Sequence, residues 1–382
     1  MTMRKIVASW SDAAPLFRHG GASFAPALDF SVNLNPLGPP ASVLTALRAA
    51  LPAVGRYPDP TCRELTHHLA EWHGVDPCQI VVGNGSSELI HALPRAVAAR
   101  RVAIVEPTYT EYLRAARRAG AEVDHWLPTI DSLIPQPFDP QGTDVVWLGN
   151  PNNPTGYVWP PDVLEQWIDD FPETIFVIDE SFQLFAEIGA TPRGRGMMDS
   201  SVRVAYREHT RTDEVPKIQD GKKLHRNCIR IRSLTKYYAL PGLRLGYAIA
   251  PPDLARRLRE QLVPWSVNSL AQVAGLAALA DEDYARRTAA WFHSSAPTAL
   301  VRQLCEMREW LEPLATATIF MLVHLRAMSA AKLTRALAAR GIAIRDASNF
   351  IGLDDAYVRL AMRLPAENDR LLDALRQVFQ EG

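Results

Sequence analysis

Short apolar segments alternate with amphipathic helical patterns through the first two thirds of the chain. The apolar segments are QIVVG, RVAIV, DVVWL, TIFVI, CIRIR and GYAIA. Helical patterns separate several of them, as TEYLRAARRAG does after RVAIV. Strands that are apolar along their whole length belong to parallel sheets, because helices cover both faces of such sheets. The pattern therefore predicts an α/β fold with a mainly parallel central sheet.

The chain divides into three segments by pattern. Its 382 residues exceed what one small core can organise, so we expect two unequal lobes. Residues 1–40 are irregular in pattern, rich in turn formers and end in NLNPLGPP, and we expect them to drape over a domain and to contribute to any ligand site there. Residues 41–270 form the predicted large domain. Residues 271–382 combine long helical patterns with the strand candidates TIFMLVHL and VRLAMR, which predicts a smaller α+β domain.

Composition excludes several classes of protein. A hydrophobic content of 47% with 22% charged residues is ordinary for a globular protein. A net charge of −1 gives no bulk attraction to nucleic acid or to an anionic membrane. No apolar run is long enough to span a bilayer, and the first residues lack the apolar core of a signal peptide, so we expect a cytoplasmic protein.

We expect no metal site. The four cysteines contain no C-x-x-C pair, which disfavours structural zinc and a thioredoxin-type redox site. His67, His68 and His73 share one helical pattern, but no carboxylate or cysteine completes a ligand set, so we interpret them as histidines on a helix surface.

One segment departs from the alternating pattern. Residues 187–228 are polar and charged, without a sustained period, and the stretch is longer than ordinary connections inside a domain. We interpret it as a surface insertion.

Residues suited to chemistry stand where the predicted strands end. The turn at 85–87 follows QIVVG, Asn153 follows DVVWL, and Asp179 ends TIFVI. Lys236 follows CIRIR. Because ligands of parallel sheets bind beyond the carboxyl ends of the strands, we expect these residues to meet in one site.

This set fits the needs of pyridoxal phosphate. The cofactor requires a lysine that holds it as an imine, a carboxylate that pairs with the pyridinium nitrogen, and a donor to its phenolic oxygen. Lys236, Asp179 and Asn153 fit these roles. The phosphate requires hydroxyls, N–H groups at a helix N-terminus and a guanidinium. The candidates for the phosphate are Gly85, Ser86, Ser87, Ser233, Thr235 and Arg244.

The motifs NPNNPTG, VIDES, SLTK and GLRLGYAIAPP resemble those of the fold-type I aminotransferases, in the branch of histidinol-phosphate aminotransferase. The resemblance implies the aspartate-aminotransferase fold and a homodimer with shared active sites. It implies that Tyr109 stacks on the cofactor ring and that Tyr57 touches the cofactor phosphate of the neighbouring subunit. Many relatives carry a tyrosine where this chain has Phe182, so Asn153 is left to bind the phenolic oxygen.

Four further segments resemble L-threonine-O-3-phosphate decarboxylases of cobalamin biosynthesis. They are HGG, DFSVNLNPLGPP, PWSVNSLAQVAG and RDASNFIGLDDAYVRLAMR. The resemblance implies decarboxylation of L-threonine O-3-phosphate to (R)-1-amino-2-propanol O-2-phosphate. It also implies that Arg359 and Arg345 meet substrate anions and that His19 and Asn33 add donors. A guanidinium suits carboxylate and phosphate equally, so the anion that each arginine binds stays open.

The residues that bind the cofactor do not by themselves determine which reaction is catalysed. The bond that breaks at the substrate Cα is the one held perpendicular to the ring, so the anion sites decide between decarboxylation and transamination. An aminotransferase for a phosphorylated substrate such as histidinol phosphate, and a decarboxylase of O-phosphoserine, stay as alternatives. We do not expect a regulator, because no helix-turn-helix or basic stripe precedes the enzyme pattern and both Lys236 and Asp179 are present.

Overall fold

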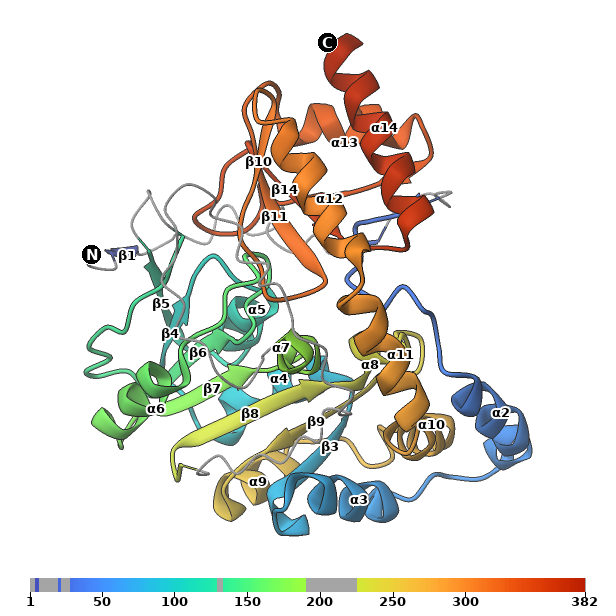
Figure 1. The fold of residues 1–382 in the computed structure, drawn as a ribbon. Coiled ribbons are helices and arrows are strands. Elements are labelled where there is room, and N and C mark those ends of the chain that lie inside the picture. Colours follow the sequence, from blue (N-terminus) through green and yellow to red (C-terminus); the bar gives the residue numbers. More distant parts are fainter. Residues whose placement is uncertain (1–3, 7–19, 22–27, 129–132, 190–224, 382) are drawn as a thin grey trace.

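The computed structural model describes residues 4–6, 20–21, 28–128, 133–189 and 225–381. His19 and most of the predicted insertion at 187–228 lie outside the described residues. The described chain forms a large sheet surrounded by helices and a smaller sheet packed against helices of the C-terminal third (Figure 1).

The large sheet has eight strands in the order β1-β5-β4-β6-β7-β8-β9-β3. Neighbouring strands from β5 to β8 are parallel, which confirms the mainly parallel sheet. Strand β1 pairs antiparallel with β5, and β9 runs antiparallel to both of its neighbours. The strands are β1 (Arg4–Ile6), β3 (Ile80–Asn84), β4 (Arg101–Val105), β5 (Glu122–Leu127), β6 (Val145–Gly149), β7 (Ile175–Asp179), β8 (Cys228–Ser233) and β9 (Leu245–Ile249).

Both faces of this sheet are buried under helices. In β6, Val145 and Trp147 join a core cluster with residues of α4 (Ser86–Ala96), α5 (Glu111–Arg118) and α9 (Pro252–Arg259). The alternate residues of β6 join a second cluster with α6 (Pro161–Asp170) on the opposite face. Side chains alternate between the faces of a strand, so a strand buried on both sides must be apolar throughout.

The reversed strand β9 brings a distant residue to the functional edge. In the register, Gly246 lies opposite Ser233, the last residue of β8, and Leu245 lies opposite Asn84, the last residue of β3. The start of β9 therefore lies at the edge where β3 and β8 end. Arg244, which directly precedes β9, is placed at this edge as a result.

The second sheet has four antiparallel strands in the order β10-β11-β14-β13. It packs with three helices in the upper part of Figure 1. These elements are β10 (Leu311–Pro313), β11 (Phe320–Leu325), β13 (Arg345–Asp346), β14 (Tyr357–Ala361), α12 (Ser295–Glu306), α13 (Ala330–Ala338) and α14 (Pro365–Glu381). The remaining helices are α2 (Ala41–Ala50), η2 (Leu51–Gly55), α3 (Arg63–His73), η3 (Pro77–Gln79), α7 (Gln183–Gly189), α8 (Leu234–Tyr237), α10 (Ser269–Leu279) and α11 (Glu282–Phe292).

The N-terminal segment is not wholly irregular, contrary to expectation. Residues 4–6 form β1 at the edge of the large sheet, and β2 (Leu28–Asp29) pairs parallel with β12 (Ile342–Ala343). These strands are two or three residues long, too short to show a period of two in the sequence.

His73 corrects a second expectation. It is buried, and its Nε2 atom lies 2.8 Å from the hydroxyl of Tyr247 on β9, so it is not a surface histidine. Within the described ranges, no group of three or more His, Cys, Asp or Glu side chains is arranged to hold a metal ion. None of the helices in the described part of the chain is long and apolar enough to cross a membrane.

Candidate active site

A pocket of about 200 Å³ lies at the edge where the parallel strands end. Most of the residues predicted from the sequence line it. These are Asn33, Ser86, Ser87, Tyr109, Asn153, Asp179, Ser233, Thr235, Lys236, Arg244 and Arg359. Chain positions from the N-terminal segment to β14 therefore converge on one site.

The carboxylate of Asp179 is buried, and each of its oxygens accepts one hydrogen bond. Its Oδ1 accepts the backbone N–H of Ser181 at 2.9 Å, and its Oδ2 accepts the hydroxyl of Tyr112 at 2.8 Å. Burial raises the pKa of Asp179, while these hydrogen bonds and the charge of Lys236 lower it. The neighbouring acid, Glu180, instead accepts a hydrogen bond from buried Arg232 at 2.8 Å. Of the two acids, Asp179 is the one that lines the pocket.

Lys236 lies on the four-residue helix α8, directly after β8. Its pKa is lowered to about 8, mainly by burial and also by the charges of Arg359 and Arg244, against the opposing effect of Asp179. A lysine with this pKa has a larger neutral fraction near neutral pH than an ordinary lysine. Such an amine can act as a nucleophile or a base.

The N-terminus of α4 and Arg244 form an anion cradle. Gly85 precedes the helix with a φ of +75°, and a Cβ built there would lie 2.6 Å from Nη2 of Arg244. Only a glycine leaves room for the guanidinium to approach this helix N-terminus. On the facing strand end, the hydroxyls of Ser233 and Thr235 are 2.7 Å apart. N–H groups, hydroxyls and a guanidinium are the donors that a phosphate group requires, so these residues fit the phosphate of pyridoxal phosphate.

Asn153 and Arg359 link the two sheets across the pocket. Nη1 of Arg359 donates to Oδ1 of Asn153 at 2.5 Å, and Nη2 donates to the carbonyl oxygen of Ser31 at 2.7 Å. Since Oδ1 of Asn153 is occupied as an acceptor, its amide N–H groups are the ones available to a ligand. N–H groups are what a donor to the phenolic oxygen of the cofactor must supply.

Arg345 lies beside Arg359 but does not line the pocket. The two arginines are register partners on β13 and β14. The guanidinium of Arg345 donates to Asn349 at 2.6 Å and lies over the ring of Phe350, 5.2 Å from its centroid. The pKa of Arg359 is lowered to about 9, mainly by burial and also by the adjacent charge of Arg345.

The predicted aromatic residues occupy different places. Tyr109 lines the pocket, and burial raises its pKa to about 12. Phe182 also lines the pocket and contacts Phe320, with ring centroids 4.8 Å apart. Tyr57 lies outside the pocket, is 83% exposed and packs against Trp265, with ring centroids 5.1 Å apart.

Sequence reasoning missed several residues that line the pocket, among them Tyr112 and Ser181. Both hydrogen-bond Asp179. Tyr112 lies in the first turn of α5, three residues after Tyr109, which precedes the helix. That proximity in the sequence is the signal that would have identified it.

A parallel α/β sheet with a lysine, a buried carboxylate, an amide donor and a phosphate cradle at its carboxyl edge defines a pyridoxal-phosphate-dependent enzyme. The family model for aminotransferase class I and II matches residues 25–375, and the chain belongs to this family. The enzyme is accordingly a decarboxylase or an aminotransferase.

The relatives of this chain include proteins named for each of these two activities. The chain is 35% identical to the threonine-phosphate decarboxylase of Salmonella typhimurium, over 92% of this chain and 91% of that protein. It is 31% identical to histidinol-phosphate aminotransferase 2 of Pseudomonas aeruginosa, over 95% of this chain and 92% of that protein. The crystal structure of L-threonine-O-3-phosphate decarboxylase from Porphyromonas gingivalis superposes with a TM-score of 0.77 at 28% identity, covering 93% of this chain and all of that one.

Proposed function

We propose that the enzyme decarboxylates L-threonine O-3-phosphate to (R)-1-amino-2-propanol O-2-phosphate, as a step of cobalamin biosynthesis. The similarity to threonine-phosphate decarboxylases supports this substrate. The structural observation that carries the proposal is that Arg359 is buried at the pocket with neutral hydrogen-bond partners.

Arg359 is a buried cation that faces the pocket with neutral partners. Its guanidinium donates to an amide oxygen and a backbone carbonyl oxygen. Within the described residues, its Nε atom has no hydrogen-bond partner. A second cation, Arg345, stands opposite on the next strand. A buried positive site of this kind is stabilised by a bound anion, because burial of a charge is costly without a counter-charge.

The proposed substrate carries two anionic groups, a carboxylate and a phosphate. Arg359 is the candidate for one of them. Arg345, Asn33 and His19 are the candidates for the other. Asn33 is buried and lines the pocket. Its Nδ2 group is the donor that it offers to an anion, because the amide oxygen is an acceptor.

The residues of the site can be assigned roles in this reaction. When bound, pyridoxal phosphate withdraws electrons from the substrate Cα, so that a bond to this atom can break heterolytically. Arg359 orients one anionic group and thereby sets which Cα bond breaks. The carboxylate of Asp179 stays ionised to hold a proton at the ring nitrogen. Lys236, whose pKa is about 8, returns a proton to Cα after CO₂ has left.

The test is an incubation of the PLP-loaded enzyme with L-threonine O-3-phosphate and no keto acid. We expect CO₂ and aminopropanol phosphate by mass spectrometry, and neither product from Lys236→Ala. If no CO₂ forms, the specific assignment is wrong. O-phosphoserine, and histidinol phosphate with 2-oxoglutarate, are then the next substrates, because the similarity to a histidinol-phosphate aminotransferase favours the second of these.

We also propose a homodimer with shared active sites. Tyr57 and Trp265 are exposed together with three aliphatic residues, Leu51, Val54 and Val263. An exposed apolar group of this kind is typical of an interface. In the proposed dimer, Tyr57 reaches the cofactor phosphate of the other subunit.

Mixing two inactive variants tests this arrangement. In a mixture of Lys236→Ala and Tyr57→Ala subunits, a mixed dimer has one site that combines an intact Lys236 with an intact Tyr57 of the partner. Activity should therefore reappear on mixing. If Tyr57 serves the site of its own subunit, every site of the mixed dimer keeps a defect and no activity returns.

A further inference from the structure

The helix that carries Lys236 is short and is held by groups outside it. Helix α8 has four residues, and Ser233 caps its N-terminus by accepting the N–H of Thr235. At its C-terminal end, the carbonyl oxygens of Thr235 and Lys236 accept the N–H groups of Leu240 at 3.0 Å and Ala239 at 3.3 Å. Other segments add further donors at this end, so the orientation of Lys236 depends in part on them.

Asn35 of the N-terminal segment supplies much of this binding. Its backbone N–H donates to the carbonyl oxygen of Lys236 at 3.1 Å. Its side-chain Nδ2 donates to the carbonyl oxygen of Tyr237 at 3.0 Å. The hydroxyl of Tyr284 reaches the same carbonyl oxygen of Tyr237 at 3.1 Å. Two hydrogen bonds thus run from Asn35 to the two consecutive carbonyl groups at the end of α8.

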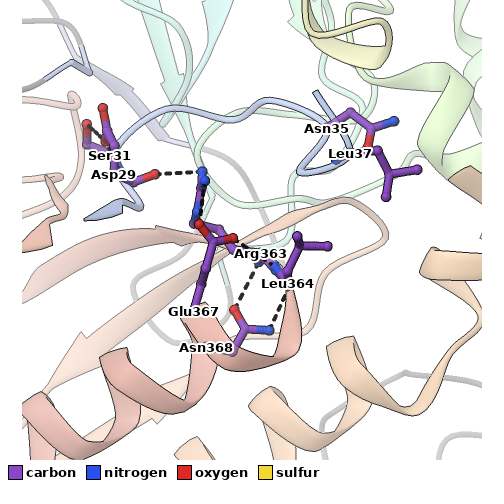
Figure 2. Close-up of polar contacts among 8 residues, drawn as sticks. All are labelled: Asp29, Ser31, Asn35, Leu37, Arg363, Leu364, Glu367 and Asn368. Carbon is purple, nitrogen blue, oxygen red and sulfur yellow. Dashed lines mark hydrogen bonds and ion pairs between the residues drawn. The ribbon is translucent and has the colours of Figure 1, made fainter. Parts of the chain in front are cut away.

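Asn35 itself is held on every polar atom. It is only 2% exposed. Its Nδ2 also donates to Oγ1 of Thr288 on α11 at 2.8 Å. Its Oδ1 accepts the backbone N–H of Leu37 at 3.1 Å, in a local turn drawn at the upper right of Figure 2. Because the side chain of Asn35 is itself fixed, it can hold the end of α8 in place.

The same stretch of chain is anchored to the smaller sheet. We call residues 28–38 the strap. The carbonyl oxygen of Phe30 accepts the N–H of Ala361, and that of Asp29 accepts Nη1 of Arg363 at 3.1 Å. Figure 2 shows Arg363 between Asp29 and Glu367, with which it forms an ion pair of 2.9 Å. One end of the strap therefore lies on β14 and the start of α14, and the other end lies on α8.

We propose that Asn35 is a positioning residue for Lys236, fixing the end of α8 so that the lysine amine is presented to the cofactor and substrate. The inference rests on the proposed function, in which Lys236 binds the cofactor and moves a proton at the substrate Cα. Asn35 touches neither of these. Its effect passes through the backbone of Lys236 and Tyr237.

Asn35→Ala tests the inference, with Thr288→Val as the matched control. The alanine variant removes both side-chain donors, whereas Thr288→Val removes one partner of Asn35 and leaves its bond to Tyr237 intact. For Asn35→Ala we expect kcat to fall at least about tenfold, because small displacements of a catalytic group have large effects on rate, while KM changes by less than about twofold. For Thr288→Val we expect both constants to stay near wild type.

A spectroscopic readout separates positioning from general destabilisation. The visible absorption band of the cofactor bound to Lys236 is titrated with pH. The positive charges of Arg359 and Arg244, opposed by the charge of Asp179, act on the Lys236 nitrogen and disfavour a positive charge on it. The imine formed by a displaced lysine should therefore titrate at higher pH. The midpoint should rise in Asn35→Ala and stay unchanged in Thr288→Val. Equal midpoints in wild type and Asn35→Ala would overturn the inference.

Tyr284→Phe keeps the test decisive if Asn35→Ala does not fold. This variant removes the second donor to the carbonyl oxygen of Tyr237, together with the contact of the same hydroxyl to the carbonyl oxygen of Gly38 in the strap, and leaves both hydrogen bonds from Asn35 in place. It should raise the midpoint in the same direction by a smaller amount, and no shift would count against the inference. Lys236→Ala distinguishes the two failures. A visible band that survives in Lys236→Ala refutes the proposed role of Lys236, whereas a Lys236-dependent band unaffected by Asn35→Ala refutes only the role of Asn35.

Discussion

The hydroxyl of Tyr112 donates a 2.8 Å hydrogen bond to Oδ2 of Asp179 beneath the pocket. The ring of Tyr112 is stacked on Trp147 of β6, with centroids 4.9 Å apart and an interplanar angle of 18°. Both residues of this stack are buried. The sheet therefore fixes the tyrosine, and the tyrosine fixes the carboxylate that we propose pairs with the ring nitrogen of the cofactor.

Tyr112→Phe should lower kcat about tenfold, the effect of losing one hydrogen bond to a charged group. The hydrogen bond from Tyr112 lowers the pKa of Asp179, so its loss raises that pKa above its already raised value. A carboxylate with a higher pKa is protonated at a higher pH as the solution is acidified. The acid limb of the kcat profile should therefore move to higher pH. An unchanged acid limb would show that Tyr112 does not affect Asp179.

Gly85→Ala should weaken cofactor binding at least about tenfold, because the added Cβ pushes Arg244 out of the anion cradle. Gly142→Ala is the matched control. Its φ is +76°, close to the +75° of Gly85, but no atom lies within 4 Å of the added Cβ. Both variants place an alanine at a positive φ, which costs on the order of 1–3 kcal/mol of backbone strain, and only Gly85→Ala should change the PLP dissociation constant measured by equilibrium dialysis. Equal dissociation constants in the two variants would contradict the cradle.

Arg359→Lys should reduce kcat/KM about 100-fold, mainly through a higher KM. A lysine keeps the charge but loses the planar fork that holds Asn153 and Ser31 together. Arg363→Lys is the control, because Arg363 also contacts the strap and does not line the pocket. Its kcat/KM should stay within about twofold of wild type in the same steady-state assay. A similar loss in both variants would mean that Arg359 acts only by holding the strap.

Lys236→Met should stabilise the cofactor-free protein. The pKa of Lys236 is about 8 in the folded state and near 10.5 when unfolded, so the folded state binds the proton more weakly. The resulting destabilisation is complete below about pH 8 and disappears as the pH rises past 10.5. The gain in the free energy of unfolding should be on the order of 1 kcal/mol or more at pH 7 and should vanish above pH 10.5. Urea unfolding at several pH values measures it, and a gain independent of pH would reflect packing of the methionine alone.

Much of the cofactor site could be predicted because it depends on local patterns. Asn153, Asp179 and Lys236 each follow an apolar segment, and the parallel-sheet rule alone places them at one edge. The prediction that His73 lies on the surface was wrong because it also rested on a local pattern alone. A helical period identifies which residues share a face, but the packing of α3 near β9 decides that His73 is buried against Tyr247.

By itself, the sequence determined the alternating α/β pattern, the residue types at each strand end and the pyridoxal-phosphate class. These follow from residues within a few positions of one another. The tertiary structure alone decided that Tyr112 donates to Asp179, that Arg345 lies opposite Arg359, and that Asn35 donates to the end of the helix of Lys236. Each of these contacts joins different elements of the fold. Strand order and packing bring those elements together, and a short stretch of sequence does not specify which other segment it will meet.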